Sequence, residues 1–82
     1  MIKILFFARL REQLSTDCLQ IPASENITTE HIRQQLANTD DLWAKVMRTD
    51  SLLVAVNQQI TDWSHSVKSG DEVAFFPPVT GG

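Results

Sequence analysis

A turn, a strand and a pair of prolines that ends the strand follow one another in residues 70–82, which read GDEVAFFPPVTGG. The Gly-Asp pair at 70–71 is typical of a turn, and Glu72–Phe76 has the β-branched and aromatic content of a strand. Pro77-Pro78 ends that strand, because proline has no N–H to donate to a sheet and restricts the residue before it. The stretch therefore predicts a last strand followed by an extended segment that cannot join the sheet.

The first residues of the chain predict a strand whose side chains alternate between two faces. We assign the residues of one parity to the core: Ile2, Ile4, Phe6 and Ala8. Phe7 falls on the other parity, together with the basic residues Lys3 and Arg9. The pattern allows its side chain to be either exposed or buried. A second strand is expected at about 18–22, after a short helical turn at 10–14.

The middle of the chain predicts two helices. Thr28 is a good N-cap for a main helix that runs to about Ala37, with Ile32 and Leu36 as its apolar stripe. Its other side chains are expected to face water: His31, Arg33, Gln34 and Gln35. Residues 42–47 predict a shorter second helix.

Strands are expected again after residue 51. Leu52–Val56 is a continuous apolar run, which is typical of a central strand buried on both faces. Asn57-Gln58 predicts a turn and Gln59–Thr61 a short return strand. Trp63 and Val67 would add core or interface surface.

This order of elements predicts an α+β fold of the β-grasp, or ubiquitin-like, type. One main helix covers one face of a mixed sheet, so the other face must be polar or reserved for a partner. Phe7, Ile60 and Phe75 are the candidates for a partner patch. We expect a domain at residues 1–76 and a flexible C-terminal Gly-Gly tail at residues 77–82.

Composition restricts the function classes. The chain has 82 residues, so we expect one domain, and its net charge is −3 with no run of basic residues, so no nucleic-acid partner is expected. The apolar start is too short for a secretory signal, so no membrane partner is expected either. The single cysteine, Cys18, excludes an intrachain disulfide and favours a cytoplasmic location.

No side-chain constellation in the sequence indicates catalysis. His31 is expected on a polar helix face, His65 in a turn-rich stretch, and Cys18 is more typical of a small apolar filler in a strand than of a nucleophile. Asp40, Asp41 and Asp50 lack the spacing of a calcium loop. We therefore expect no metal and no bound cofactor.

The tail offers different chemistry. Pro77, Pro78, Val79 and Thr80 favour an extended, uncharged segment, and Gly81 and Gly82 have no Cβ, so they can pass through a narrow channel. The five residues from Pro78 to Gly82 could reach roughly 16 Å. The reactive group would then be the main-chain carboxyl of Gly82, which becomes an acyl donor once a nucleotide-using partner adenylates it.

Three segments carry a resemblance that runs nearly end to end. They are the opening MIKILFFA with Arg11-Glu12, the segment AVNQ at 55–58, and the thirteen residues GDEVAFFPPVTGG at 70–82. In these segments the chain resembles the MoaD family, the small sulfur-carrier subunits of molybdopterin synthase.

The resemblance implies a carrier that is not an enzyme on its own. Gly82 would be adenylated by an ATP-dependent enzyme related to ubiquitin E1 and converted to a thiocarboxylate. The tail would then enter the large synthase subunit and donate sulfur to cyclic pyranopterin monophosphate, within a heterotetramer of two large and two small subunits. Phe7, Ile60 and Phe75 would form the docking patch, and Arg11 matches a position resembling a partner contact.

Other functions stay open. Related carriers serve thiamine thiazole synthesis or tRNA thiolation, although the segment 75–79 and the helix at 42–47 argue against them. A protein modifier joined to lysines through Gly82, or a plain interaction domain, would also fit the tail and the fold.

Overall fold

The computed structural model of the chain describes residues 1–78 and contains five strands and three helices within them. In chain order these are β1 (Ile2–Phe6), α1 (Arg9–Leu14), β2 (Cys18–Ile21), α2 (Thr29–Ala37), α3 (Asp41–Met47), β3 (Leu53–Val56), β4 (Gln59–Thr61) and β5 (Glu72–Phe76). The short helix, the main helix, the second helix and the last strand all lie where the sequence predicts them. The predictions made for Val79, Thr80, Gly81 and Gly82 concern residues outside the described range.

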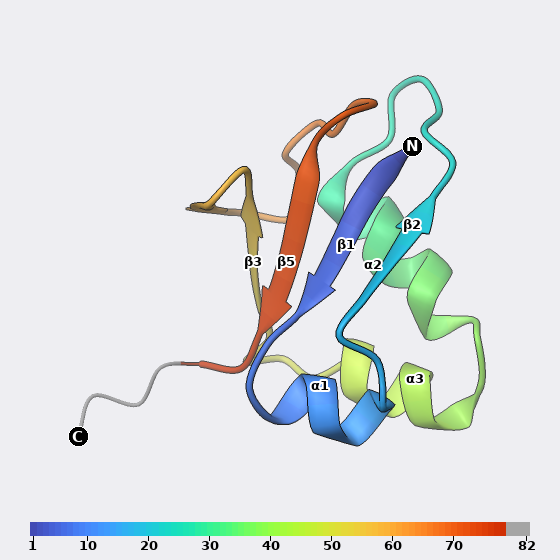
Figure 1. Cartoon of the computed structure of the whole chain (residues 1–82), viewed down its shortest axis with the longest axis vertical. Coiled ribbons are helices and arrows are strands. Elements are labelled where there is room, and N and C mark those ends of the chain that lie inside the picture. Colours follow the sequence, from blue (N-terminus) through green and yellow to red (C-terminus); the bar gives the residue numbers. More distant parts are fainter. Residues whose placement is uncertain (79–82) are drawn as a thin grey trace.

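The strands form one mixed sheet in the order β2-β1-β5-β3-β4 (Figure 1). β1 and β5 are parallel, and the other neighbouring pairs are antiparallel. The last strand in the sequence is therefore the central strand of the sheet. Leu52–Val56 was expected to form a central strand buried on both faces, and this is confirmed: β3 is an interior strand between β5 and β4, and Val54, Ala55 and Val56 are all buried.

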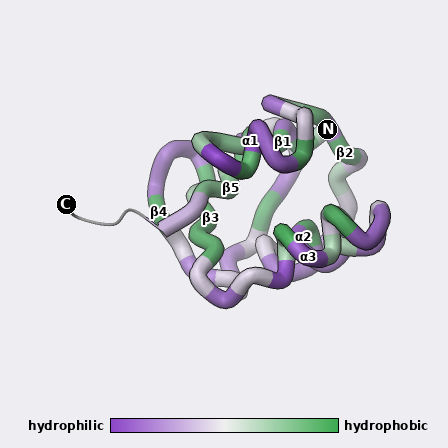
Figure 2. The backbone as a smooth tube through the Cα atoms, turned by 90° about the horizontal axis from the view of Figure 1, so that it is seen from below, coloured by the Kyte–Doolittle hydropathy of each residue, from purple (hydrophilic) through white to green (hydrophobic). Residues whose placement is uncertain are grey.

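The helices cover one face of the sheet. α2 and α3 lie on the same side of it (Figure 2). Their buried apolar side chains belong to the same core cluster as those of the strands. Phe6 is the centre of this core, with its ring edge-on to Trp43 and stacked on Phe75. The largest fully buried side chains are Phe6, Phe75, Ile2, Ile4, Ile32, Met47, Val54 and Val73. The fold is thus the β-grasp arrangement that the order of elements predicts.

The chain leaves the sheet earlier than expected after β1. Ala8 is exposed and has a φ of 55°, a left-handed conformation that ends the alternation of the strand and starts α1. Its assignment to the core is therefore wrong. Phe7 lies just before this change of direction and is 46% exposed, so the exposed alternative holds.

The start of α2 is held by a reciprocal pair of hydrogen bonds. The Thr28 hydroxyl accepts from the backbone N–H of His31, and His31 Nδ1 accepts from the backbone N–H of Thr28. Thr28 is the expected cap, whereas the partner role of His31 was not predicted. Histidine takes here the place that Glu or Gln usually has in this motif.

Arg33 was expected to face water, and this is only partly correct. It is half-buried, and its guanidinium donates to the carbonyl oxygens of Met47 and Thr49 at the end of α3. It also lies 4.4 Å from the centre of the Trp63 ring. Arg33 therefore ties α2 to α3 and to the segment that follows β4.

We predict that His31→Ala lowers the free energy of unfolding by about 0.5–1 kcal/mol, because the N–H of Thr28 loses its acceptor. His31→Glu should retain the stability of the original protein, since a carboxylate can accept the same bond. Urea denaturation of the three proteins checks this. Equal losses in both variants would show that the imidazole contributes by something other than accepting that bond.

Candidate functional site

The central position of β5 determines where the tail leaves the domain. β5 is paired along its length with β1 on one side and β3 on the other, and the N–H of Phe7 donates to the carbonyl of Phe75 at 3.2 Å. The chain then passes through Pro77, which is half-buried, to Pro78, which is exposed. Residues 77–78 therefore start from a strand that is held on both sides.

The start of β5 is also fixed. Asn57 follows β3 and exchanges two hydrogen bonds with Glu72: its N–H donates to the Glu72 carbonyl, and its side-chain oxygen accepts from the Glu72 N–H. Asp71 accepts from the N–H of Lys68 and from the Asn57 amide, and these bonds, the first above all, hold its pKa below the ordinary value. These contacts fix the position of the strand from which the tail continues.

One face of the sheet carries no helix within the described part of the chain, and most of its side chains are apolar. The register places Leu5 beside Ala74, Ala74 beside Ala55, and Ala55 beside Ile60 on that face. We call this surface the open face and define it by its apolar members: Leu5, Phe7, Leu53, Ala55, Ile60, Ala74 and Phe76.

The open face is hollowed along β5. The hollow has a volume of about 470 Å³ and is lined by Phe7, Ala55, Gln58, Ile60, Glu72, Ala74 and Phe76. Ile60 is 70% exposed, which is unusual for a large aliphatic side chain. A contiguous apolar surface of this kind is typical of a protein interaction site.

Two of the three predicted patch residues lie on this surface, and the third does not. Phe75 is 0% exposed, and its ring stacks between Phe6 and Trp63. The cause is the register: Phe75 pairs with Phe6, and residues paired in neighbouring strands share a face, so Phe75 belongs to the core. The assignment of Phe75 to the patch is wrong, and Phe76 takes its place.

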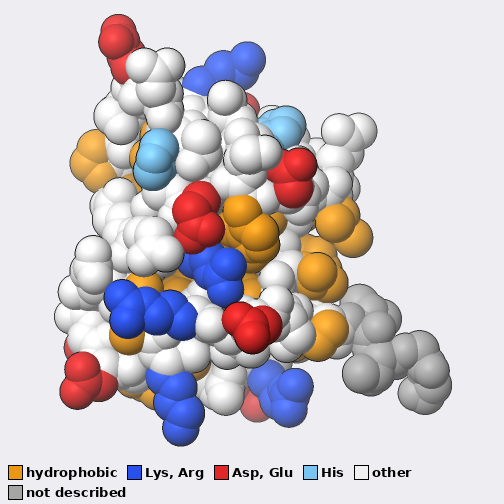
Figure 3. Space-filling model, turned by 180° about the vertical axis from the view of Figure 1, so that it is seen from behind, with side chains coloured by type: hydrophobic (Ala, Val, Ile, Leu, Met, Phe, Trp, Pro, Cys, Tyr) orange, Lys and Arg blue, Asp and Glu red, His pale blue; other side chains and the backbone are white. Residues whose placement is uncertain are grey.

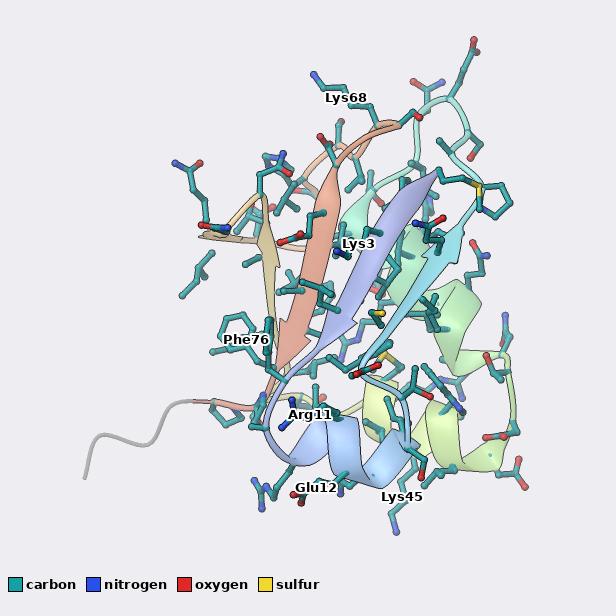
Figure 4. All side chains as sticks on the ribbon, in the orientation of Figure 1. Lys3, Arg11, Glu12, Lys45, Lys68 and Phe76 are labelled. Carbon is teal, nitrogen blue, oxygen red and sulfur yellow. The ribbon has the colours of Figure 1, made fainter. Side chains whose placement is uncertain are left out.

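Arg11 lies on α1 and is exposed. Figure 4 shows its side chain at the same end of the molecule as Phe76, close to where β5 ends. From this position a basic group can contact a protein that binds the tail. The structure contains nothing that tests such a contact, so the role of Arg11 stays a prediction.

The remaining reactive side chains in residues 1–78 do not form a site. Cys18 is exposed at the edge strand β2, and no group of three or more metal-ligating side chains is found in that range. Hydrogen bonds from the Ser64 hydroxyl and N–H lower the pKa of Asp62, so this carboxylate is part of a local turn. No helix in the described range is long and apolar enough to cross a membrane.

Comparison with known proteins identifies relatives of the whole chain. Residues 4–82 match a model described as the ThiS family. The chain is 49% identical to the molybdopterin synthase sulfur carrier subunit of Escherichia coli and 45% identical to that of Haemophilus influenzae. Both alignments span 82 residues and cover 100% of each chain.

Solved structures share the fold at lower sequence identity. SAMP1 from Haloferax volcanii has a TM-score of 0.83 and 22% identity, with 99% of this chain and 98% of that chain covered. A chain from the complex of subunits 1 and 2 of the molybdopterin-converting factor of Helicobacter pylori has a TM-score of 0.68 and 23% identity, covering 99% and 97%. At such identities the likeness establishes the fold alone.

We predict that Phe75→Leu lowers the free energy of unfolding by about 1–3 kcal/mol, because it leaves a gap between two aromatic rings in the core. Phe76→Leu should change it by less than about 0.5 kcal/mol, because that ring lies on the open face. Urea denaturation of this matched pair checks the assignment. A larger loss of unfolding free energy in Phe76→Leu than in Phe75→Leu would contradict the assignment of Phe75 to the core and Phe76 to the open face.

Proposed function

This chain belongs to the ThiS family, and from that membership we propose that it is the sulfur-carrier subunit of a molybdopterin synthase. The observation that carries the proposal is the full-length identity of 49% and 45% to two curated carriers of that name. The open face beside the base of the tail supports it, because a carrier needs a surface by which a partner holds the domain while the tail is used.

The proposed chemistry takes place on the main-chain carboxyl of Gly82. An ATP-dependent activating enzyme of the E1 type joins this carboxylate to AMP and releases pyrophosphate. A sulfur nucleophile of the hydrosulfide class then attacks the acyl carbon, the bond to AMP breaks, and a thiocarboxylate remains. The carboxylate oxygen becomes a good leaving group only in the adenylate, so ATP is consumed before sulfur enters.

The thiocarboxylate then acts in the large subunit. Its sulfur attacks a carbon of cyclic pyranopterin monophosphate, the carbon–oxygen bond at that carbon breaks, and the oxygen leaves with the bonding electrons and takes up a proton. Water then attacks the acyl carbon of the resulting thioester. The acyl–sulfur bond breaks, sulfur stays on the pterin, and the carboxylate of Gly82 is restored. A dithiolene holds two sulfurs, so each product requires two loaded carriers.

In this proposal the domain presents the tail and is not a catalyst on its own. The described residues supply a docking surface and a fixed base for the tail, whereas pterin-binding groups would come from the large subunit. We place Phe7, Ile60 and Phe76 in the contact with that subunit, with Arg11 at its rim. Assembly into a heterotetramer with two large subunits at the centre is part of the same proposal.

We predict that incubation with an activating enzyme of the host, ATP and sulfide changes one oxygen to sulfur at Gly82. Intact-mass measurement followed by tandem fragmentation locates the change. A variant that lacks Gly81 and Gly82 is the matched control and should stay unmodified.

The same experiment separates the alternatives. An unchanged mass, with a thiazole carrier converted in parallel, would overturn the sulfur-carrier assignment. Lysine-linked conjugates through Gly82 in cell extracts would instead identify a protein modifier.

We predict that Ile60→Glu weakens binding to the large subunit at least tenfold, because it places a charge in the apolar hollow of the open face. Gln35→Glu introduces the same side chain on the exposed side of α2 and should bind like the original protein. Titration calorimetry measures both. Equal affinities would show that the open face is not the docking surface.

A further inference from the structure

A second hollow lies at the end of the molecule from which residues 77–78 leave the sheet. It has a volume of about 260 Å³ and is built by α1, α3, the residues just before β3 and Pro77-Pro78. We call it the end pocket. It is separate from the hollow of the open face, because the lining residues of the two differ throughout.

The end pocket has an apolar floor and a basic rim. Leu10, Val46 and Leu52 lie in its lining and are almost fully buried. Arg9 and Lys45 also line it and are exposed, and no Asp or Glu is among the lining residues. The pocket thus combines apolar depth for a side chain with positive charge for a carboxylate, although the whole chain has a net charge of −3.

Leu42 is the feature of the end pocket that the fold does not explain. The other apolar residues of α3 pack into the core, including Trp43, Val46 and Met47, whereas Leu42 is 49% exposed and lines the pocket. Figure 3 shows that Lys and Arg side chains gather over the lower half of the back of the molecule, the end that contains α1 and α3. Figure 4 shows Lys45 at that end.

The two hollows lie on either side of the start of the tail. Phe76 lines the hollow of the open face, and the next two residues, Pro77 and Pro78, line the end pocket. A protein that follows the chain from Phe76 past Pro78 therefore passes from one hollow to the edge of the other. Continuity of this kind favours one partner that contacts both surfaces.

We propose that the end pocket is a second docking site for the large subunit, and that it takes a large aliphatic side chain flanked by an Asp or Glu of that subunit. This inference rests on the proposed function. The aliphatic group fills the floor between α1 and α3, and the carboxylate lies between Arg9 and Lys45. Contact at a single apolar surface permits rotation about it, whereas a second contact beside Pro77-Pro78 restricts the direction in which the chain leaves the domain.

Zero-length carbodiimide cross-linking of the complex with the large subunit tests this contact directly. The reagent joins an amine to a carboxylate within contact distance, with loss of water. We expect an amide between Lys45 Nζ and an Asp or Glu that lies next to an aliphatic residue in the large subunit. Lys68, in a loop at the other end of the sheet, is the internal control and should form no such link (Figure 4).

Affinity measurements give a second, independent readout. Lys45→Glu should weaken binding to the large subunit about tenfold at low salt and less at high salt, because the charge at the rim is reversed. Leu42→Ser should weaken it about three- to tenfold without salt dependence. Gln35→Glu adds the same side chain on the exposed side of α2 and should leave the affinity unchanged. All three side chains are exposed, so the variants should unfold at the same urea concentration as the original.

The outcomes distinguish this inference from the proposed function. One outcome would overturn the end pocket alone. In it, Ile60→Glu weakens binding to the large subunit, Lys45→Glu and Leu42→Ser do not, and no Lys45 cross-link forms. If Lys45→Glu weakened binding to the activating enzyme but not to the large subunit, the end-pocket proposal would also be overturned, because the occupant would belong to a different partner. Failure of the original protein to bind the large subunit at all would overturn both.

Discussion

The parallel pairing of β1 with β5 is the constraint on which the rest of the structure depends. It joins the two ends of the chain and makes the last strand the centre of the sheet, with β2 outside β1 and β3 and β4 on the other side. Through the register it also decides which side chains enter the core, since Phe75 pairs with Phe6. A strand that is held on both sides gives the tail a fixed starting point, which an edge strand would not.

Local patterns were sufficient to predict most of the elements. Pro77-Pro78 marks the end of β5, Thr28 marks the start of α2, and the alternation in β1 assigns Ile2, Ile4 and Phe6 correctly to the core. The errors lie where a change of backbone direction or a contact between distant segments decides the answer, as for Ala8, Arg33 and Phe75. The apolar run Leu52–Val56 correctly indicates a buried interior strand, whereas its neighbours β5 and β4 are known only from the pairing.

The exchange of Phe75 for Phe76 follows from the same limitation. Two adjacent phenylalanines in a strand must point to opposite faces, and the sequence offers no local sign of which one enters the core. Parity in β5 becomes known only when its register with β1 is known.

The end pocket could not be predicted for a similar reason, because it is assembled from α1, α3, the start of β3 and Pro77-Pro78, which are far apart in the chain. The chemistry proposed for the tail rests on residue type and order alone, so it stays a prediction from the sequence.

The composition of the tail also determines where binding energy has to come from. Gly81 and Gly82 have no side chain that a partner could bury, and holding a glycine in one conformation costs more backbone entropy than holding any other residue. Affinity for a partner that takes the tail must therefore come mainly from the folded domain. In the proposed function the open face would supply apolar area for this purpose, and Ile60 and Phe7 are already exposed there. Under the proposed function the two tasks are separate, because the domain would provide affinity and orientation while the chain end would provide the reacting atom.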